Sequence, residues 1–417
     1  MTSIFNRFSQ TVAALIAAVA ISGPVIAQDA VTDALTESRM PLVYDGETFS
    51  GEGWDFLITE ADSAQYFLIG EEHGIAENPI LAADLFIDAG FEKLVIEVSP
   101  FIADLMDTTL KDGGWDALRD MFADKRKRPA FFGMTEEAVM LADIRAALPD
   151  ADQVFWGVDY EVVGDGVMLA ALAEFEKSQA AEEALENVTL LSEEGWQAYE
   201  DTGNPLNIFS FSNAADAVTE LRMAWTDPPA EAAGILETLE ETQLINGLFM
   251  SGQGWASNNR RAAFLRSNFL RHWKAAESSP RVMLKLGASH LIRGRNPTKT
   301  FDLGTLVPEI AEIEGVGVFS ILVLPGEDAM TAVLDPVTLT YGEAPGKDGY
   351  SEGLDLFFDA AFEDGFTVLD MRSLRPLSGK LEGENAAKLT NIIHGFDAVV
   401  VMTGSQPSGN VGDWKAE

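Results

Sequence analysis

Two of the four histidines in this 417-residue sequence lie in near-copies of one short pattern. In each copy an apolar run is followed by a glycine, two further residues and the histidine, giving Gly70-Glu-Glu-His73 and Gly287-Ala-Ser-His290. An imidazole titrates near neutral pH, so it can serve as a general base, a general acid or a metal ligand. A single histidine after an apolar run often only satisfies a turn, but the recurrence favours a functional interpretation.

Carboxylates accompany these histidines. Glu71 and His73 are two residues apart, so in an extended chain their side chains can converge, and the carboxylate can orient the imidazole or share a metal ion with it. Glu97 lies inside the apolar run 93–100, where a buried ionised carboxylate needs a cation or a metal as partner. Asp159 follows a third apolar run. Each acid alone could cap a helix, but together they predict a ring of carboxylates around the histidines.

A predicted helix supplies further polar groups. Arg261 and Asn268 fall on one helix face with Leu265 between them. Such a face could clamp a carboxylate or stabilise an oxyanion, and the structural alternative is that Arg261 pairs with a buried acid such as Glu97. Glu137 stands in Thr135-Glu-Glu137 at the start of an amphipathic segment, where a helix N-terminus is the simpler interpretation.

The elements that must position these residues are strands alternating with helices. This pattern predicts an α/β fold with a mostly parallel central sheet flanked by helices, and ligands bind such sheets at the carboxyl ends of the strands. The sequence favours one domain, residues 28–417, with its core in 50–163 and 255–405. The expected strands are 65–70, 93–99, 153–159, 281–287, 316–324, 366–371 and 398–403.

Three other segments differ from this pattern. Residues 164–254 are rich in Ala, Glu and Leu with helical spacing, which predicts a helical insertion that shapes a substrate pocket or extends the helical layer. Residues 327–352 and 404–417 are rich in Gly, Pro and Asp, and we expect loops or a frayed tail there.

Residues 1–27 have the features of a secretory signal peptide. Arg7 precedes the apolar stretch 11–22, and Val25-Ile-Ala27 provides a cleavage site, so we expect a periplasmic or secreted protein beginning near Gln28. An uncleaved anchor is the alternative. No later stretch is long and apolar enough to span a membrane.

Composition excludes several classes of partner and site. Lys and Arg number 28 against 67 Asp and Glu, a net charge of −39, which repels nucleic acid and anionic lipid. The absence of cysteine excludes thiolate metal sites, a cysteine nucleophile and disulfides. We expect a small-molecule or peptide substrate.

These motifs, in this order, resemble the superfamily that joins erythromycin esterase-like proteins, ChaN-like haem-uptake proteins and Tiki/TraB metalloprotease-like proteins. The order in which the motifs follow one another is more specific to this superfamily than any single motif. The matching stretches are Gly70–Gly74, Val95–Glu97, Phe132–Glu137, Gly157–Asp159, Arg261–Asn268 and Leu286–Leu291.

The esterase-like branch implies a hydrolase in which His73 activates water against an ester without a metal, and we expect the substrate carbonyl to be that of an ester or an amide. Glu71 and Glu97 would orient His73 or the water, and His290 and Arg261 would stabilise developing charge. Glu137, Asp159 and Asn268 would then bind substrate.

The first motif departs from that branch, because esterase-like members usually have G-E-x-x-H, whereas a single residue separates Glu71 from His73. The shorter spacing resembles the other two branches. The Tiki-like branch implies a divalent metal held by His73, His290 and Glu97. The ChaN-like branch implies a haem- or iron-binding envelope protein without catalysis, and a non-catalytic descendant is a further alternative.

Overall fold

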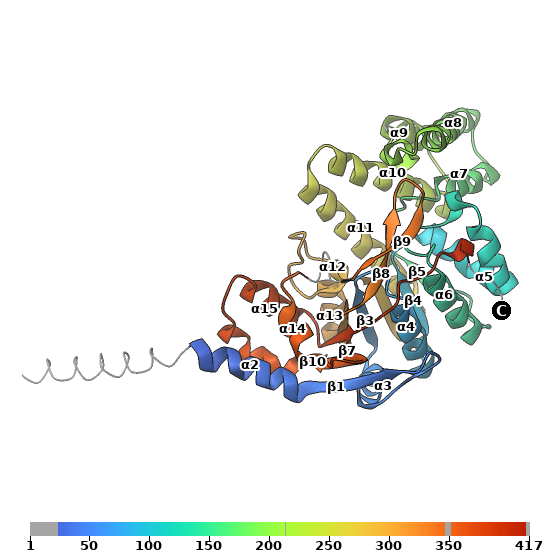
Figure 1. Cartoon of the computed structure of the whole chain (residues 1–417). Helices are drawn as coiled ribbons and strands as arrows, with labels where there is room; N and C mark the ends of the chain where they lie inside the picture. The colour runs from blue at the N-terminus through green and yellow to red at the C-terminus, as the bar shows by residue number, and fades with distance from the viewer. Residues whose placement is uncertain (1–23, 213, 347–351, 414–417) are drawn as a thin grey trace, which may run out of the picture.

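The computed structural model describes residues 24–212, 214–346 and 352–413 (Figure 1), so most of the expected signal peptide lies outside the described residues. A nine-stranded sheet of order β2-β1-β10-β11-β7-β3-β6-β4-β5 forms the centre. Its strands are β1 (Arg39–Tyr44), β2 (Phe49–Ser50), β3 (Tyr66–Glu71), β4 (Lys93–Ile96), β5 (Phe155–Gly157), β6 (Val282–Gly287), β7 (Val318–Pro325), β10 (Phe366–Asp370) and β11 (Ala398–Met402).

The six strands from β11 to β5 run parallel, and β10, β1 and β2 add antiparallel pairs at one edge. The predicted fold class, a mostly parallel sheet flanked by helices, is therefore confirmed. β3, β6 and β7 are buried along nearly their whole length, which explains their continuous apolar sequences. The expected strands 93–99 and 153–159 end earlier, at Ile96 and Gly157.

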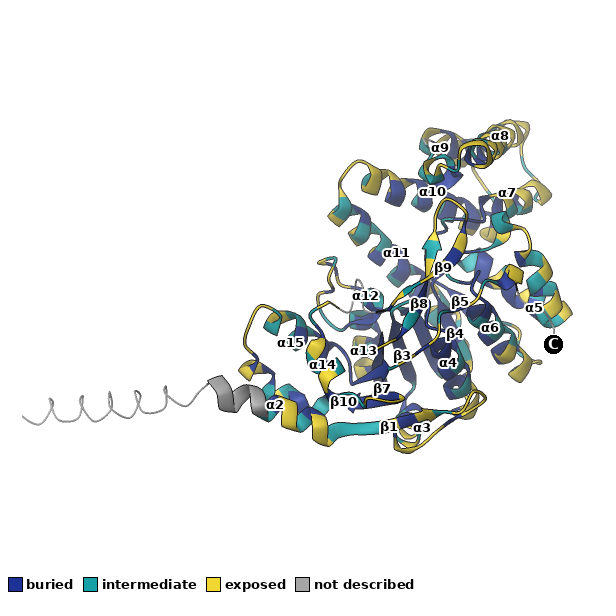
Figure 2. Cartoon of the chain, in the orientation of Figure 1, coloured by how far each residue is buried: buried dark blue, intermediate teal, exposed yellow. Residues whose placement is uncertain are grey.

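Helices pack on both faces of this sheet, and Figure 2 shows buried strands between helices whose outer sides are exposed. Alternate residues of β3 divide between the two cores, with Phe67 and Ile69 in one and Tyr66 and Leu68 in the other. The first core includes residues of α3 (Glu52–Ser63), α4 (Glu77–Asp88), α5 (Pro100–Phe122) and α6 (Thr135–Ala147). The second includes residues of α2 (Pro24–Ser38), α11 (Gly254–Ala275), α12 (Ala288–Leu291), α13 (Leu303–Glu314), α14 (Asp355–Ala360) and α15 (Ala386–Gly395).

A separate helical layer lies at the top of the molecule in Figure 1. Its helices share a core of their own, which includes Leu172, Leu185, Val218 and Leu239. Helix α11 leads from this layer back to the sheet, where Leu265 and Phe269 join the second core. The helices are α7 (Asp165–Glu174), α8 (Gln179–Thr202), α9 (Ala215–Ala224) and α10 (Ala230–Met250).

The segment that we expected to be loop, 327–352, instead contains the antiparallel hairpin β8 (Met330–Asp335) and β9 (Thr340–Pro345). Ala332 and Tyr341 are buried against Met134, so the hairpin has an apolar anchor despite its polar composition. Tyr199 of α8 donates a hydrogen bond to the Val337 carbonyl oxygen at 2.8 Å. The 404–413 tail is also ordered, through bridges from Pro407 to Ile75 and from Asn410 to Met134.

Short 3-10 helices complete the described chain, at Lys125–Lys127, Pro205–Asn207, Phe209–Phe211, Arg372–Lys380 and Val411–Asp413. Within the described ranges, no helix combines the length and the apolar character needed to cross a membrane.

Candidate active site

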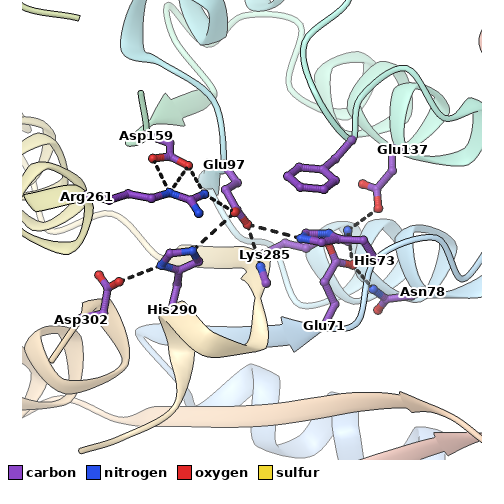
Figure 3. Close-up of polar contacts among 12 residues, drawn as sticks. Glu71, His73, Asn78, Glu97, Glu137, Asp159, Arg261, Lys285, His290 and Asp302 are labelled. Atoms are coloured by element: carbon purple, nitrogen blue, oxygen red, sulfur yellow. Dashed lines mark hydrogen bonds and ion pairs between the residues drawn. The ribbon is translucent and has the colours of Figure 1, made fainter. Parts of the chain in front are cut away.

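The two histidine motifs meet because β3 and β6 are parallel neighbours in register, with Glu71 opposite Gly287. His73 follows the end of β3, and His290 lies in the one-turn helix α12 directly after β6. Both line one cleft of about 320 Å³, with Glu97 between them (Figure 3). Arg261 and Asn258 of α11 and the loop residues Asn296, Thr298 and Thr300 complete its walls.

The His73 imidazole is held on two sides. Its Nδ1 lies 2.9 Å from Glu71 Oε1, and since a carboxylate can only accept, Nδ1 carries the hydrogen. Its Nε2 faces Glu97 Oε2 at 3.8 Å, too long for a direct hydrogen bond. Phe131 stacks on the ring, with 3.8 Å between centroids. His73 therefore presents a fixed Nε2 to the cleft, with a quarter of its side chain (25%) exposed.

His290 is arranged in the same way with different partners. Its Nδ1 lies 2.7 Å from Asp302 Oδ2, and its Nε2 lies 3.5 Å from Glu97 Oε1. Asp302 is itself fixed, because its other oxygen accepts the Leu303 N–H at the start of α13. The His290 side chain is 12% exposed, so it lies deeper than His73.

Glu97 joins the two halves of the cleft. Its Oε1 accepts from Arg261 Nη2 at 2.6 Å, and its Oε2 accepts from the Gly287 N–H at 2.7 Å. A Cβ at Gly287 would lie 3.1 Å from His73 Nε2 and 3.4 Å from Glu97 Oε2, so a larger residue there would crowd both groups. Arg261 also binds both oxygens of Asp159, which fixes the guanidinium between two acids.

A buried ion cluster lies behind His73. Lys285, in the middle of β6, places its Nζ 2.6 Å from both Glu71 Oε2 and Glu137 Oε1. Asn78 donates to the same Glu71 oxygen. All four side chains are buried, and among the described residues Glu137 Oε2 has no hydrogen-bond partner. A single lysine therefore forms ion pairs with two buried carboxylates.

These surroundings set the charge of the ionisable groups. Burial raises the pKa of Glu97, but His290, Arg261 and His73 outweigh it and bring the pKa to about 2. Burial lowers the pKa of His73, yet Glu71 and Glu97 raise it above its ordinary value. Burial and Arg261 lower the pKa of His290, and Glu97 and Asp302 reverse the net shift upward. Burial raises the pKa of Glu137 to about 7.

The structure thus brings together Glu71, His73, Glu97, Arg261 and His290. Asp159 lies behind Arg261 and orients it. Glu137 and Asn268, expected to contact substrate, do not line the cleft. Asn268 is buried and donates to the Val158 carbonyl oxygen at 2.9 Å, so its observed contact is structural.

The residues of this site that sequence reasoning missed include Lys285, Asp302 and Phe131. Lys285 had a readable signal, because a lysine within an apolar strand needs a buried acid in the same way that Glu97 needed a cation. Asp302 and Phe131 had none, since their roles depend on how distant segments pack.

The arrangement does not fit the metal site that the resemblance implied at His73, His290 and Glu97. Arg261 forms an ion pair with Glu97, so a guanidinium already neutralises the carboxylate that a divalent cation would need. Among the described residues, no group of three or more His, Asp or Glu side chains is suited to holding a metal.

No protein-family model matches this chain, and no curated protein matches it either. Solved structures that resemble it include a mutant of erythromycin esterase EreC in its open conformation, with 16% identity over 87% of this chain and 95% of that one and a TM-score of 0.59. The chain has an erythromycin esterase-like fold.

Two further structures share this esterase-like fold. A protein from Bacillus cereus is 16% identical over 92% of this chain and 99% of its own, with a TM-score of 0.57. A succinoglycan biosynthesis protein is 13% identical over 92% and 98%, also with a TM-score of 0.57. The likeness concerns the fold, and it gives no support to the ChaN-like or Tiki/TraB-like branches.

Proposed function

We propose that this protein is an exported hydrolase in which His73 activates water for attack on an ester or amide carbonyl. The observation that carries the proposal is the convergence of two imidazoles, each with its Nδ1 fixed by an acid and its Nε2 directed at Glu97. Fixing Nδ1–H leaves Nε2 as the basic atom, which is how a carboxylate prepares a histidine for general-base catalysis.

In the proposed reaction, His73 Nε2 removes a proton from water as the water oxygen bonds to the carbonyl carbon. The negative charge that develops on the carbonyl oxygen is stabilised by Arg261 and by protonated His290, both of which line the cleft. The bond from carbon to the leaving oxygen or nitrogen then breaks, and the imidazolium returns its proton to the leaving group. The products are an acid and an alcohol or amine.

The remaining acids hold these groups in place. Glu71 sets the His73 tautomer, and Asp302 does the same for His290. Glu97 stays ionised at any pH well above 2 and holds Arg261. The esterase-like fold supports the ester reading, because one of its solved members is an esterase.

Steady-state hydrolysis by the purified protein tests this proposal, with p-nitrophenyl acetate, p-nitrophenyl butyrate, the anilide analogues and erythromycin as substrates. We expect turnover that His73→Ala abolishes while thermal unfolding stays nearly unchanged. Full activity in a His73→Ala/His290→Ala double variant would contradict it. Export is tested separately, by mass spectrometry of the mature N-terminus, which we expect near Gln28.

A further inference from the structure

Phe131 is unusual in both its backbone and its side chain. Its φ of 68° lies in the left-handed region, which is costly for a large side chain and persists only where surrounding contacts enforce it. Its ring stacks on the His73 imidazole, with 3.8 Å between centroids and 15° between planes. The strained conformation is therefore what places an aromatic face on the proposed base.

The contacts that enforce this conformation come from distant segments. The Phe131 N–H donates to Tyr341 Oη at 2.8 Å, from strand β9 of the hairpin. Tyr341 is buried, and its backbone exchanges two hydrogen bonds with the Asn410 side chain, at 2.8 and 3.0 Å. Asn410 also bridges Met134, three residues after Phe131. The hairpin and the C-terminal segment thus fix Phe131 together.

The same two segments hold the backbone next to His73. The carbonyl oxygen of Gly74 accepts from the N–H of Ala332 in β8 at 2.9 Å and from the N–H of Ser408 at 3.0 Å. Gly74 has a φ of 93°, and a Cβ there would lie 2.1 Å from the Ala332 carbonyl oxygen. His73 is therefore held at its backbone and at its ring by the hairpin and the residues near 405–410.

We propose that Phe131 is a positioning residue for His73, whose ring holds the imidazole plane and stabilises the imidazolium formed when water is deprotonated. The aromatic face carries negative charge density, so it attracts the imidazolium more than the neutral imidazole. This preference arises as the proton moves to His73, so it lowers the barrier for the chemical step. The inference rests on the proposed general-base role of His73.

The test compares four variants in the full-length protein. Phe131→Leu keeps an apolar side chain but removes the aromatic face, Phe131→Tyr keeps the face, and Tyr341→Phe removes the hydroxyl that binds the Phe131 N–H. Phe249→Leu is the matched control, because Phe249 is 61% exposed on α10 and does not line the cleft. Thermal unfolding establishes that each variant is folded.

One measurement is independent of activity. The ring current of Phe131 displaces the proton NMR signals of the His73 ring, which His73→Gln identifies among only four histidines. We expect Phe131→Leu to move these signals toward those of an exposed histidine, Phe131→Tyr and Phe249→Leu to leave them in place, and Tyr341→Phe to shift them partly. Unmoved signals in folded Phe131→Leu would overturn the stacking, and unmoved signals in folded Tyr341→Phe would overturn the role of the Tyr341 hydroxyl in holding Phe131.

The kinetic measurement uses p-nitrophenyl acetate. We expect Phe131→Leu to lower kcat by about 3- to 30-fold with KM changed by less than about twofold, and Phe131→Tyr to restore kcat. A shifted NMR signal with unchanged kcat would refute the role in catalysis. Absence of hydrolysis by the wild-type protein would refute the proposed function instead, and the NMR comparison would still decide whether Phe131 positions His73.

Discussion

The ends of β3 and β6 carry the same short pattern but surround their histidines differently. After β3, the acid that holds His73 is Glu71, two residues away in the same motif. After β6, the acid that holds His290 is Asp302, on a later loop at the start of α13. The motif therefore sets where each histidine lies, but it does not by itself determine which acid holds the ring.

The cations differ as well. Lys285 lies behind Glu71, on the far side from the cleft, and His73 keeps the more exposed position. Arg261 contacts the same Glu97 oxygen that His290 faces, and it lines the cleft itself. A more accessible imidazole suits proton transfer with water, and an imidazole beside a guanidinium suits stabilisation of an anion.

The largest effect should come from removing each histidine in turn. We expect His73→Ala to lower kcat/KM for p-nitrophenyl acetate by about 10³- to 10⁴-fold, because it removes the general base. His290→Ala should cost less, about 10²- to 10³-fold, because Arg261 still faces the developing charge. The exposed His394, bonded to Ser378 outside the cleft, is the matched control, and His394→Ala should retain full activity. Equal losses in the two cleft variants would show that the halves are not specialised.

The next effect concerns stability in the β3 half. Lys285→Met should lower the free energy of unfolding by about 3–5 kcal/mol, because it leaves Glu71 and Glu137 buried without their shared cation. Chemical denaturation measures this loss. Arg261→Met is the comparison in the other half, and we expect a smaller loss because its side chain is 24% exposed to water.

A second variant separates the lost charge from lost packing. Adding Glu137→Gln to Lys285→Met removes the acid that loses its cation partner, since Glu71 keeps its bond to His73, and should recover part of the stability. The measurement is made above pH 8, because the pKa of Glu137 is already raised to about 7 with the lysine present, and no recovery there would mean that the lysine acts through its hydrocarbon chain.

Many features of the two halves could be predicted from the sequence. The features that could not be predicted depend on how distant segments pack. The apolar runs ending in G-x-x-H predicted the parallel strands, and Glu97 inside an apolar run required the cation that Arg261 supplies. Lys285 gave the same signal and was overlooked. Asp302 and the hairpin could not be predicted, because a turn-rich segment becomes ordered only when residues such as Tyr341 find a buried contact elsewhere.

The pH dependence should separate the two halves. Because His73 must be neutral and its pKa is raised, kcat/KM should fall as the pH drops through a value above 6.5. Protonated His290, whose pKa is also raised, should give a loss at higher pH. Glu71→Gln should move the acid limb down by about one pH unit, and Asp302→Asn should move the basic limb instead. If both variants move the same limb, the two assignments are wrong.

The same shifts predict the sign of the pH effect on stability. A histidine whose pKa is raised by folding contributes stability that is fully present below its unfolded pKa, about 6.5, and lost as the pH rises through the folded value. The free energy of unfolding of Glu71→Gln should therefore depend less on pH above 6.5 than that of the wild type.

Chelation should have the smallest effect on activity. This experiment tests whether the cation bound to Glu97 in the cleft is Arg261 or a metal ion. If His73, His290 and Glu97 held a metal, the two imidazoles would be equivalent ligands, and removal of the metal by EDTA would abolish activity. Arg261 instead pairs with Glu97 Oε1, the oxygen that His290 faces, so the cation that lines the cleft belongs to the His290 half. We therefore expect kcat/KM after dialysis against EDTA to stay within about twofold of the untreated value, whereas loss of activity restored by Zn²⁺ would contradict that expectation.

The Arg261→Gln variant tests the same point in the opposite direction, because removing the guanidinium exposes the Glu97 carboxylate between two imidazoles. Zn²⁺ binding, measured by calorimetry, should then appear in the variant and be absent from the wild type.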